Sequence, residues 1–171
     1  MYDCSLITTV NDSDFEAVYY NNQATIDKNM GFTNTVYDTD EKKIEMMKTY
    51  FNHNTEESVL VKIVRQSNGE VVGYLKGHNH GDTFEITNAV FMNNVMGGFG
   101  NGFYIDTHAF WKTLGFKYIE ACLVKEAEGV VAFTRGACYK PDFFRYVSER
   151  EHPMAHHENV PDCIIVKLEI L

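Results

Sequence analysis

At the start of the chain, the pattern of apolar residues predicts a short strand and then an amphipathic helix. Residues Cys4 to Val10 form a short run rich in β-branched side chains, which predicts an opening strand. Ser13 and Glu16 then match a capping box, in which the serine hydroxyl accepts from a first-turn amide and the glutamate reaches back. A helix is predicted from there to about Lys28. Its apolar face consists of Phe15, Val18, Tyr19 and Ile26.

A second amphipathic helix is predicted from Thr39 to Phe51. It follows a polar, glycine-containing stretch at 30–37 that is typical of a loop. Asp38 and Glu41 repeat the capping pattern, and Ile44 and Met47 share a face with the final phenylalanine. Both helices therefore have one apolar side that needs a surface to cover.

After residue 53 the period changes from helical to alternating. The runs Ser58 to Gln66, Glu70 to His78 and Thr83 to Met92 each predict a strand. Asn68-Gly69 separates the first two runs, and His80-Gly81-Asp82 separates the last two; glycine and asparagine tolerate the positive φ that hairpin turns require. Three consecutive antiparallel strands are therefore predicted.

The second half of the chain predicts alternating helices and strands. Helical spacing runs from Phe103 to Leu114 and ends at a glycine, and Ala127 to Cys138 predicts a further short helix. Strands are predicted at Phe116 to Val124, Phe143 to Glu149 and Cys163 to Ile170.

The composition fits one soluble domain. The chain has 171 residues, of which 44% are hydrophobic, so residues 1–171 are expected to form a single domain with its own core. No segment approaches the roughly 18 apolar residues that a membrane helix needs, and no basic stretch precedes an apolar run. A cytoplasmic protein with no membrane partner is therefore expected. Reduced, buried thiols are predicted for the four scattered cysteines, Cys4, Cys122, Cys138 and Cys163.

The charge balance restricts the class of partner. Fifteen basic and 24 acidic residues give a net charge of −9, and the basic residues are dispersed. Because nucleic-acid affinity comes mainly from Lys and Arg contacts to phosphates, a nucleic-acid partner is not expected. A cationic, amine-bearing partner suits this field better.

A glycine-dense segment, Asn93 to Gly102, leads directly into the predicted helix at Phe103. The first amides of a helix have no partner within it, and glycines let a phosphate approach the backbone, so this order predicts an anion site. The alternative is a turn that only reverses the chain. A nucleotide triphosphate loop would need Lys and Ser or Thr after the last glycine, where Phe103-Tyr104 stand. A dinucleotide loop would need a preceding parallel unit, where antiparallel strands are predicted.

The order of these elements resembles that of the GNAT superfamily of N-acetyltransferases. That family has a strand, two helices, three antiparallel strands, a pyrophosphate loop with its helix, a strand, a helix and two final strands. The resemblance covers essentially the whole chain. It implies an α/β (α+β) fold of order β-α-α-β-β-β-α-β-α-β-β, with a mixed, mostly antiparallel central sheet flanked by helices.

The resemblance also implies a cosubstrate, acetyl-CoA or another acyl-CoA. The family loop reads Arg/Gln-x-x-Gly-x-Gly/Ala; Gly100 and Gly102 match it, and Gly97 stands where Arg or Gln is usual. Main-chain groups around Val90 and Met92 would pair with the pantetheine arm, or these residues would only pack in the core. The implied pyrophosphate contacts are Gly97, Gly98, Phe99, Gly100, Asn101 and Gly102.

Three residues are the candidates for catalysis that the resemblance implies. A carboxylate on the strand before the loop often serves as the base, and Glu85 lies within about one residue of that position; the alternative is a solvated strand glutamate. The usual acid is a tyrosine in the late helix, where this chain has Thr134, with Tyr139 at the place of a closing aromatic. Either the thiolate leaves without help, or Tyr139 or Cys138 donates the proton, or catalysis has been lost.

The histidines predict no metal site. The one-letter codes of His78-Asn79-His80 read HNH, which is also the name of a nuclease motif. That motif consists of residues spaced apart in the sequence and not of a tripeptide, so a nuclease site is not predicted. His152, His156 and His157 lie in an acidic loop that contains proline, without a third correctly spaced ligand.

Two functions remain open from the sequence. The first is an acyl-CoA-dependent N-acyltransferase that acts on an amine of a small molecule or protein, with Tyr19, Tyr20 and Tyr37 as candidate walls of the acceptor pocket or as ordinary packing residues. The alternative is a catalytically silent GNAT-fold module that binds its own copies or a larger assembly.

Overall fold

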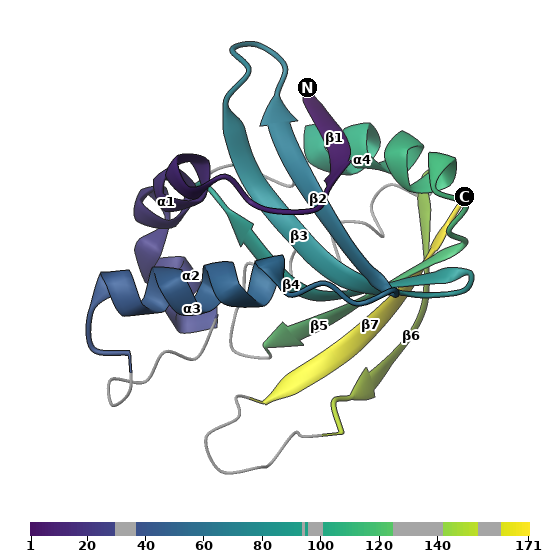
Figure 1. Cartoon of the computed structure of the whole chain (residues 1–171). Helices are drawn as coiled ribbons and strands as arrows, with labels where there is room; N and C mark the ends of the chain where they lie inside the picture. The colour runs from purple at the N-terminus through teal and green to yellow at the C-terminus, as the bar shows by residue number, and fades with distance from the viewer. Residues whose placement is uncertain (30–36, 94, 96–100, 125–141, 154–161) are drawn as a thin grey trace.

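The structure is a computed structural model that describes residues 1–29, 37–93, 95, 101–124, 142–153 and 162–171. Its central feature is a twisted sheet of seven strands in the order β1-β2-β3-β4-β5-β7-β6 (Figure 1). The strands are β1 (Tyr2–Ile7), β2 (Ser58–Arg65), β3 (Val71–His80), β4 (Thr83–Phe91), β5 (Tyr118–Val124), β6 (Phe144–Glu151) and β7 (Cys163–Ile170). The helices are α1 (Asp12–Asn21), α2 (Gln23–Asn29), α3 (Asp40–Asn52) and α4 (Asn101–Thr113).

The predicted mixed, mostly antiparallel sheet is confirmed. β4 and β5 run parallel, and the other five pairs of neighbouring strands are antiparallel. The two predicted hairpin turns are also present, with Gly69 at φ 72° and Gly81 at φ 74°. The opening strand begins and ends earlier than predicted, because Val10 already belongs to the connection to α1, where its N–H donates to Asn52 Oδ1 at 2.8 Å.

The first predicted helix is divided in two, and its cap differs from the prediction. Asn11 caps α1 by accepting from the amide of Asp14 at 3.1 Å, so the capping residue is not Ser13. The helix is interrupted at Asn22, whose side chain donates to the Phe91 carbonyl at 2.9 Å, and α2 begins at the next residue. This contact with a distant strand leaves no trace in the local pattern of apolar residues.

The second predicted helix, α3, is confirmed with a shifted cap. Thr39, rather than Asp38, accepts from the amide of Lys42 at 3.3 Å. Asp38 instead forms an exposed ion pair with the side chain of Lys42 at 2.6 Å. Helix α4 also forms as predicted and ends near Gly115, which adopts φ 80°. The helix predicted at 127–138 and most of the loop predicted at 30–37 lie outside the described residues.

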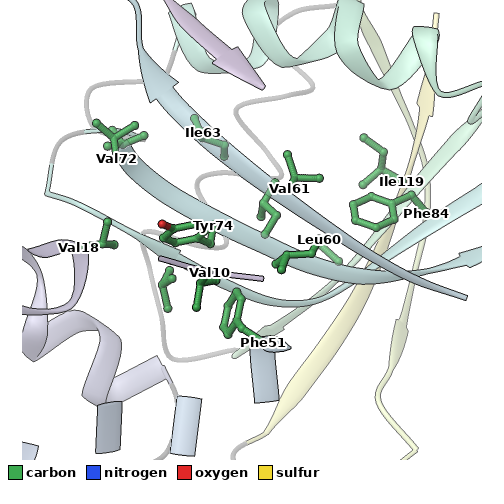
Figure 2. Close-up of a cluster of buried hydrophobic side chains, with 14 of the residues drawn as sticks. Val10, Val18, Phe51, Leu60, Val61, Ile63, Val72, Tyr74, Phe84 and Ile119 are labelled. Carbon is green, nitrogen blue, oxygen red and sulfur yellow. The ribbon is translucent and has the colours of Figure 1, made fainter. Parts of the chain in front are cut away.

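The core fills both faces of the sheet. On the face covered by α1 and α3, the ring of Phe15 packs against those of Phe51 at 5.4 Å and Tyr74 at 5.6 Å. Figure 2 shows Phe51 and Tyr74 within this buried cluster. On the face covered by α4, Phe84 stacks on Trp111 at 4.9 Å and on Phe116 at 5.4 Å. The alternation of strand side chains therefore serves two apolar layers. None of the helices in the described residues is long and apolar enough to cross a membrane.

Candidate functional site

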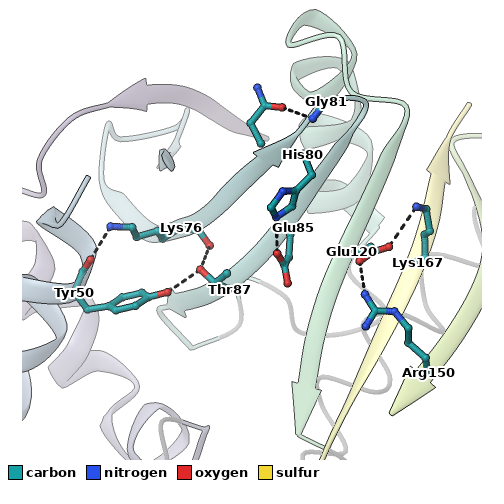
Figure 3. Close-up of polar contacts among 10 residues, drawn as sticks. Tyr50, Lys76, His80, Gly81, Glu85, Thr87, Glu120, Arg150 and Lys167 are labelled. Carbon is teal, nitrogen blue, oxygen red and sulfur yellow. Dashed lines mark hydrogen bonds and ion pairs between the residues drawn. The ribbon is translucent and has the colours of Figure 1, made fainter. Parts of the chain in front are cut away.

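A β-bulge in the middle of β4 organises the candidate site. Lys76 pairs with Asn88 whereas Gly77 pairs with Ile86, so Thr87 is an extra residue that no residue of β3 opposes. The Thr87 hydroxyl accepts a hydrogen bond from Tyr50 Oη at 2.8 Å and donates to the Lys76 carbonyl at 3.2 Å (Figure 3). The first bond ties the bulge to α3, and the second ties it to β3.

Beyond the bulge, β4 and β5 separate. They pair only over Thr83 to Ile86 and Tyr118 to Ala121. From there β4 continues beside β3, whereas β5 continues beside β7. Because a strand edge presents unpaired N–H and C=O groups, this divergence exposes main-chain groups that an extended ligand could pair with.

The described geometry refines the expected contacts of Val90 and Met92. Both side chains are buried, which agrees with core packing. The amide of Met92 donates to the Val72 carbonyl at 2.9 Å, and its carbonyl accepts from the amide of Val95 at 3.4 Å. Since alternate residues of a strand direct their main-chain groups to opposite sides, Ala89 is the neighbour that turns toward the β5 side. Pairing of Val90 and Met92 with a ligand stays a prediction.

Glu85 lies two residues before Thr87, on the sheet face that α3 also covers. Its carboxylate is 31% exposed and lies 2.8 Å from Nε2 of His80. The side chain is therefore reachable from solvent and held in place by one hydrogen bond. This position suits a carboxylate that accepts a proton.

A second carboxylate, Glu120, stands beside Glu85 on β5 in parallel register. Its oxygens contact Arg150 at 2.9 Å and Lys167 at 3.3 Å (Figure 3). Glu120 is thus compensated by two cations, whereas the described polar partner of Glu85 is a histidine. Of these two neighbouring carboxylates, Glu85 is the better candidate for proton transfer.

Lys76 links the candidate site to the C-terminal end of α3. The residue is 2% exposed, and its ammonium group donates to the carbonyls of Tyr50 at 2.7 Å, Phe51 at 3.1 Å and His53. Burial lowers the pKa of Lys76, but three acceptors at the negative end of α3 match the three N–H donors of the charged form. The role of Lys76 is to fix α3 to the bulged strands.

The remaining predicted site residues divide into two groups. Asn101 and Gly102 are the first two residues of α4, which agrees with a glycine segment that enters a helix. The second group lies outside the described residues: Gly97, Gly98, Phe99, Gly100, Thr134 and Tyr139.

Two of the tyrosines expected near an acceptor differ in exposure. Tyr19 is buried and donates to Asp27 at 2.8 Å, so it packs in the interior, while Tyr20 is 52% exposed.

The structure adds contacts that the sequence analysis missed. The network of Tyr50, Thr87 and Lys76 depends on the bulge, which no local pattern revealed. The proximity of His80 to Glu85 depends on the register of the β3–β4 hairpin. The signal available in the sequence was alternation: residues 78 and 80 share one face of a strand, and Glu85 follows just after the turn.

The sequence has no match among known protein-family profiles, and none among curated protein sequences. Solved structures do match. A protein from Chromobacterium violaceum, described as a probable acetyltransferase of the GNAT family, has a TM-score of 0.65 at 11% identity, covering 98% of this chain and 82% of that one. The ribosomal-protein-S5-alanine acetyltransferase from Vibrio fischeri has a TM-score of 0.61 at 11% identity, covering 99% and 92%.

An acetyltransferase from Bacillus subtilis, solved in complex with CoA, matches over 100% of both chains with a TM-score of 0.54 at 15% identity. At such low identities, these likenesses establish the fold. The chain has the fold of the GNAT N-acetyltransferases, as the predicted order of elements indicated.

Proposed function

We propose that this protein is an acyl-CoA-dependent N-acyltransferase that transfers an acetyl group to an amine of a small molecule or protein. The observation that carries the proposal is the bulge at Thr87 followed by the divergence of β4 and β5, immediately before the glycine segment and α4. In this arrangement the main-chain edge of β4 would pair with the pantetheine arm. The amides at the start of α4, together with residues 97–102, would hold the pyrophosphate.

The reaction requires two proton transfers. The amine nitrogen attacks the thioester carbonyl, forming the C–N bond, and the tetrahedral intermediate then collapses with cleavage of the C–S bond. The nitrogen loses one proton, and the CoA sulfur gains one. Glu85 would accept the amine proton, directly or through a water molecule. Thr134 and Tyr139 stay predictions for the group that protonates the sulfur.

The electrostatic character of the chain supports an amine acceptor. A net charge of −9 attracts a cationic amine, and the carboxylate of Glu85 is partly exposed to solvent. An amine that arrives protonated must lose a proton before it attacks, which is the step assigned to Glu85.

Release of free CoA thiol, measured with acetyl-CoA and a panel of amines, tests this function. Glu85→Gln should lower turnover by about 100-fold or more, because general-base catalysis typically contributes 10²–10⁴-fold. The affinity for acetyl-CoA should stay nearly unchanged, since Glu85 is not assigned to cofactor binding.

Glu120→Gln is the matched control, because Glu120 is the same residue type in register on the adjacent strand. It should change turnover by only a few-fold. Full activity in Glu85→Gln, or equal losses in both variants, would show that Glu85 is not the base.

A further inference from the structure

Three potential metal ligands meet on the β3–β4 hairpin. His78 and His80 are two residues apart on β3 and therefore share a face, and Glu85 on β4 is the register partner of His78. One ligand atom from each lies within 4.8 Å of the other two. Within the described residues, this is the one group of three histidine, cysteine or acidic side chains whose ligand atoms lie close enough together to hold a metal ion.

The geometry is close to that of a bound ion. His80 Nε2 and Glu85 Oε2 are already 2.8 Å apart, and the rings of His78 and His80 are 6.1 Å apart at an angle of 80°. Ligand atoms about 2.0–2.2 Å from a tetrahedral zinc ion lie about 3.4 Å from one another. The His80–Glu85 pair must therefore lengthen slightly, and any pair near 4.8 Å must shorten; rotation of the half-exposed His80 side chain can contribute to both changes.

The backbone that carries these side chains is well defined. The hairpin turn has Gly81 at φ 74°, and its amide donates to Asn79 Oδ1 at 3.0 Å (Figure 3). Paired strands on both sides of the turn fix the spacing of the three ligands. The site is thus built on a rigid element rather than on a loop, which favours a defined metal geometry.

The donor set selects the class of ion. Two imidazole nitrogens and one carboxylate oxygen suit zinc and neighbouring first-row transition metals, whereas calcium and magnesium prefer all-oxygen sites. Three protein ligands leave at least one coordination position for water or another small ligand.

We propose that His78, His80 and Glu85 form a binding site for a divalent transition-metal ion, with zinc as the best-fitting ion. A second consequence rests on the proposed function. Because Glu85 cannot both coordinate an ion and accept a proton from an amine, zinc at this site would inhibit acyl transfer.

Isothermal titration of the untagged full-length chain with zinc chloride tests the site directly. Binding of one zinc ion per chain is expected. His78→Ala and His80→Ala should each weaken the affinity by about 100-fold or more, since even loss of an outer-shell partner costs 10–100-fold. His53→Ala is the control, because His53 is exposed at the end of α3 and lies outside the group; it should bind zinc as the native chain does.

A cobalt spectrum supplies a second readout. Cobalt bound by two histidines and a carboxylate should show visible absorption without the intense ultraviolet bands of a thiolate ligand, and His80→Ala should abolish it. Thiolate bands, no zinc binding up to about millimolar, or equal affinity in the native and His80→Ala chains would overturn the proposal. Acyl transfer is therefore measured on the chain after treatment with a chelator: zinc binding by a chain that shows no acyl transfer when metal-free would refute only the proposed function, and acyl transfer by a chain that binds no zinc would refute only the metal site.

Discussion

At the scale of single residues, the partly buried thiols on the sheet show how location controls reactivity. Cys4 and Cys122 are both free, and the pKa of each thiol is raised from 9.0 to about 12. Burial is the largest cause for both. Nearby acidic groups add to it, namely Asp3 and Asp106 around Cys4, and Cys163 and Glu85 around Cys122. Both thiols are free, as predicted, but they are only partly buried, whereas Cys163 is buried as predicted.

Alkylation of the native chain near pH 8 should therefore label Cys4 and Cys122 very slowly. A rise in pKa from 9.0 to about 12 lowers the thiolate fraction about 1000-fold, and the thiolate is the reacting species. Mass-spectrometric mapping after iodoacetamide treatment measures this effect, with the urea-denatured chain as the control. Labelling of either residue at similar rates in the native and denatured chains would contradict it.

The sequence predicted where Glu85 lies along its strand, but not which side chain it contacts. Strand alternation and the family resemblance singled out Glu85, and the structure places it beside the bulge. Its neighbour His80 was missed, because their contact depends on the pairing register of β3 and β4, in which His78 lies opposite Glu85 and His80 lies opposite Thr83. The rejection of a nuclease motif at His78-Asn79-His80 considered these residues alone, and their closeness to Glu85 on the next strand became visible only in the structure.

At the scale of elements, the bulge in β4 depends on the close packing of β3 against it. A side chain at Gly77 would place its Cβ against the Glu85 carbonyl and the ring of Phe84, closer than real Cβ atoms come. The chain therefore needs glycine here for contact between strands and not for a turn. Main chain is one of the obstacles, so rotation of a side chain cannot remove the clash.

Gly77→Ala should destabilise the fold by about 1–3 kcal/mol or more, as overpacking of a close-packed interior does. Urea denaturation monitored by circular dichroism measures the change in the free energy of unfolding. Gly69→Asn is the control: Gly69 has a positive φ that asparagine tolerates, and nothing lies within 4 Å of its added Cβ. Comparable stability of the Gly77→Ala and native chains would show that the strands do not pack this closely.

Elements themselves were largely predictable, whereas their ends were not. Strand β7 is an exception, predicted with its observed bounds from an apolar run in which Lys167 and Glu169 alternate with apolar residues. The first helix was predicted as continuous because its apolar spacing continues across Asn22. The break arises from a hydrogen bond between the Asn22 side chain and β4, which lies 69 residues later.

At the scale of the whole molecule, the sheet brings together chain segments that the sequence separates. β7 inserts between β5 and β6, so the last strand of the chain becomes internal. Local patterns predict strands but not this order, because pairing depends on contacts over long separations. The resemblance in element order implied a mixed, mostly antiparallel sheet but did not place β7 between β5 and β6. The divergence of β4 and β5, on which the proposed function depends, is likewise a property of the assembled sheet.

Isothermal titration of the native chain with acetyl-CoA tests the central claim, that the diverging strands and the start of α4 form an acyl-CoA site. The expected result is one molecule bound per chain with a dissociation constant well below millimolar, together with release of CoA thiol once a suitable amine is added. Binding without thiol release for any amine would instead favour a catalytically silent module. If neither acetyl-CoA nor CoA binds below about millimolar, where the binding free energy is only about −4 kcal/mol, the claim is wrong.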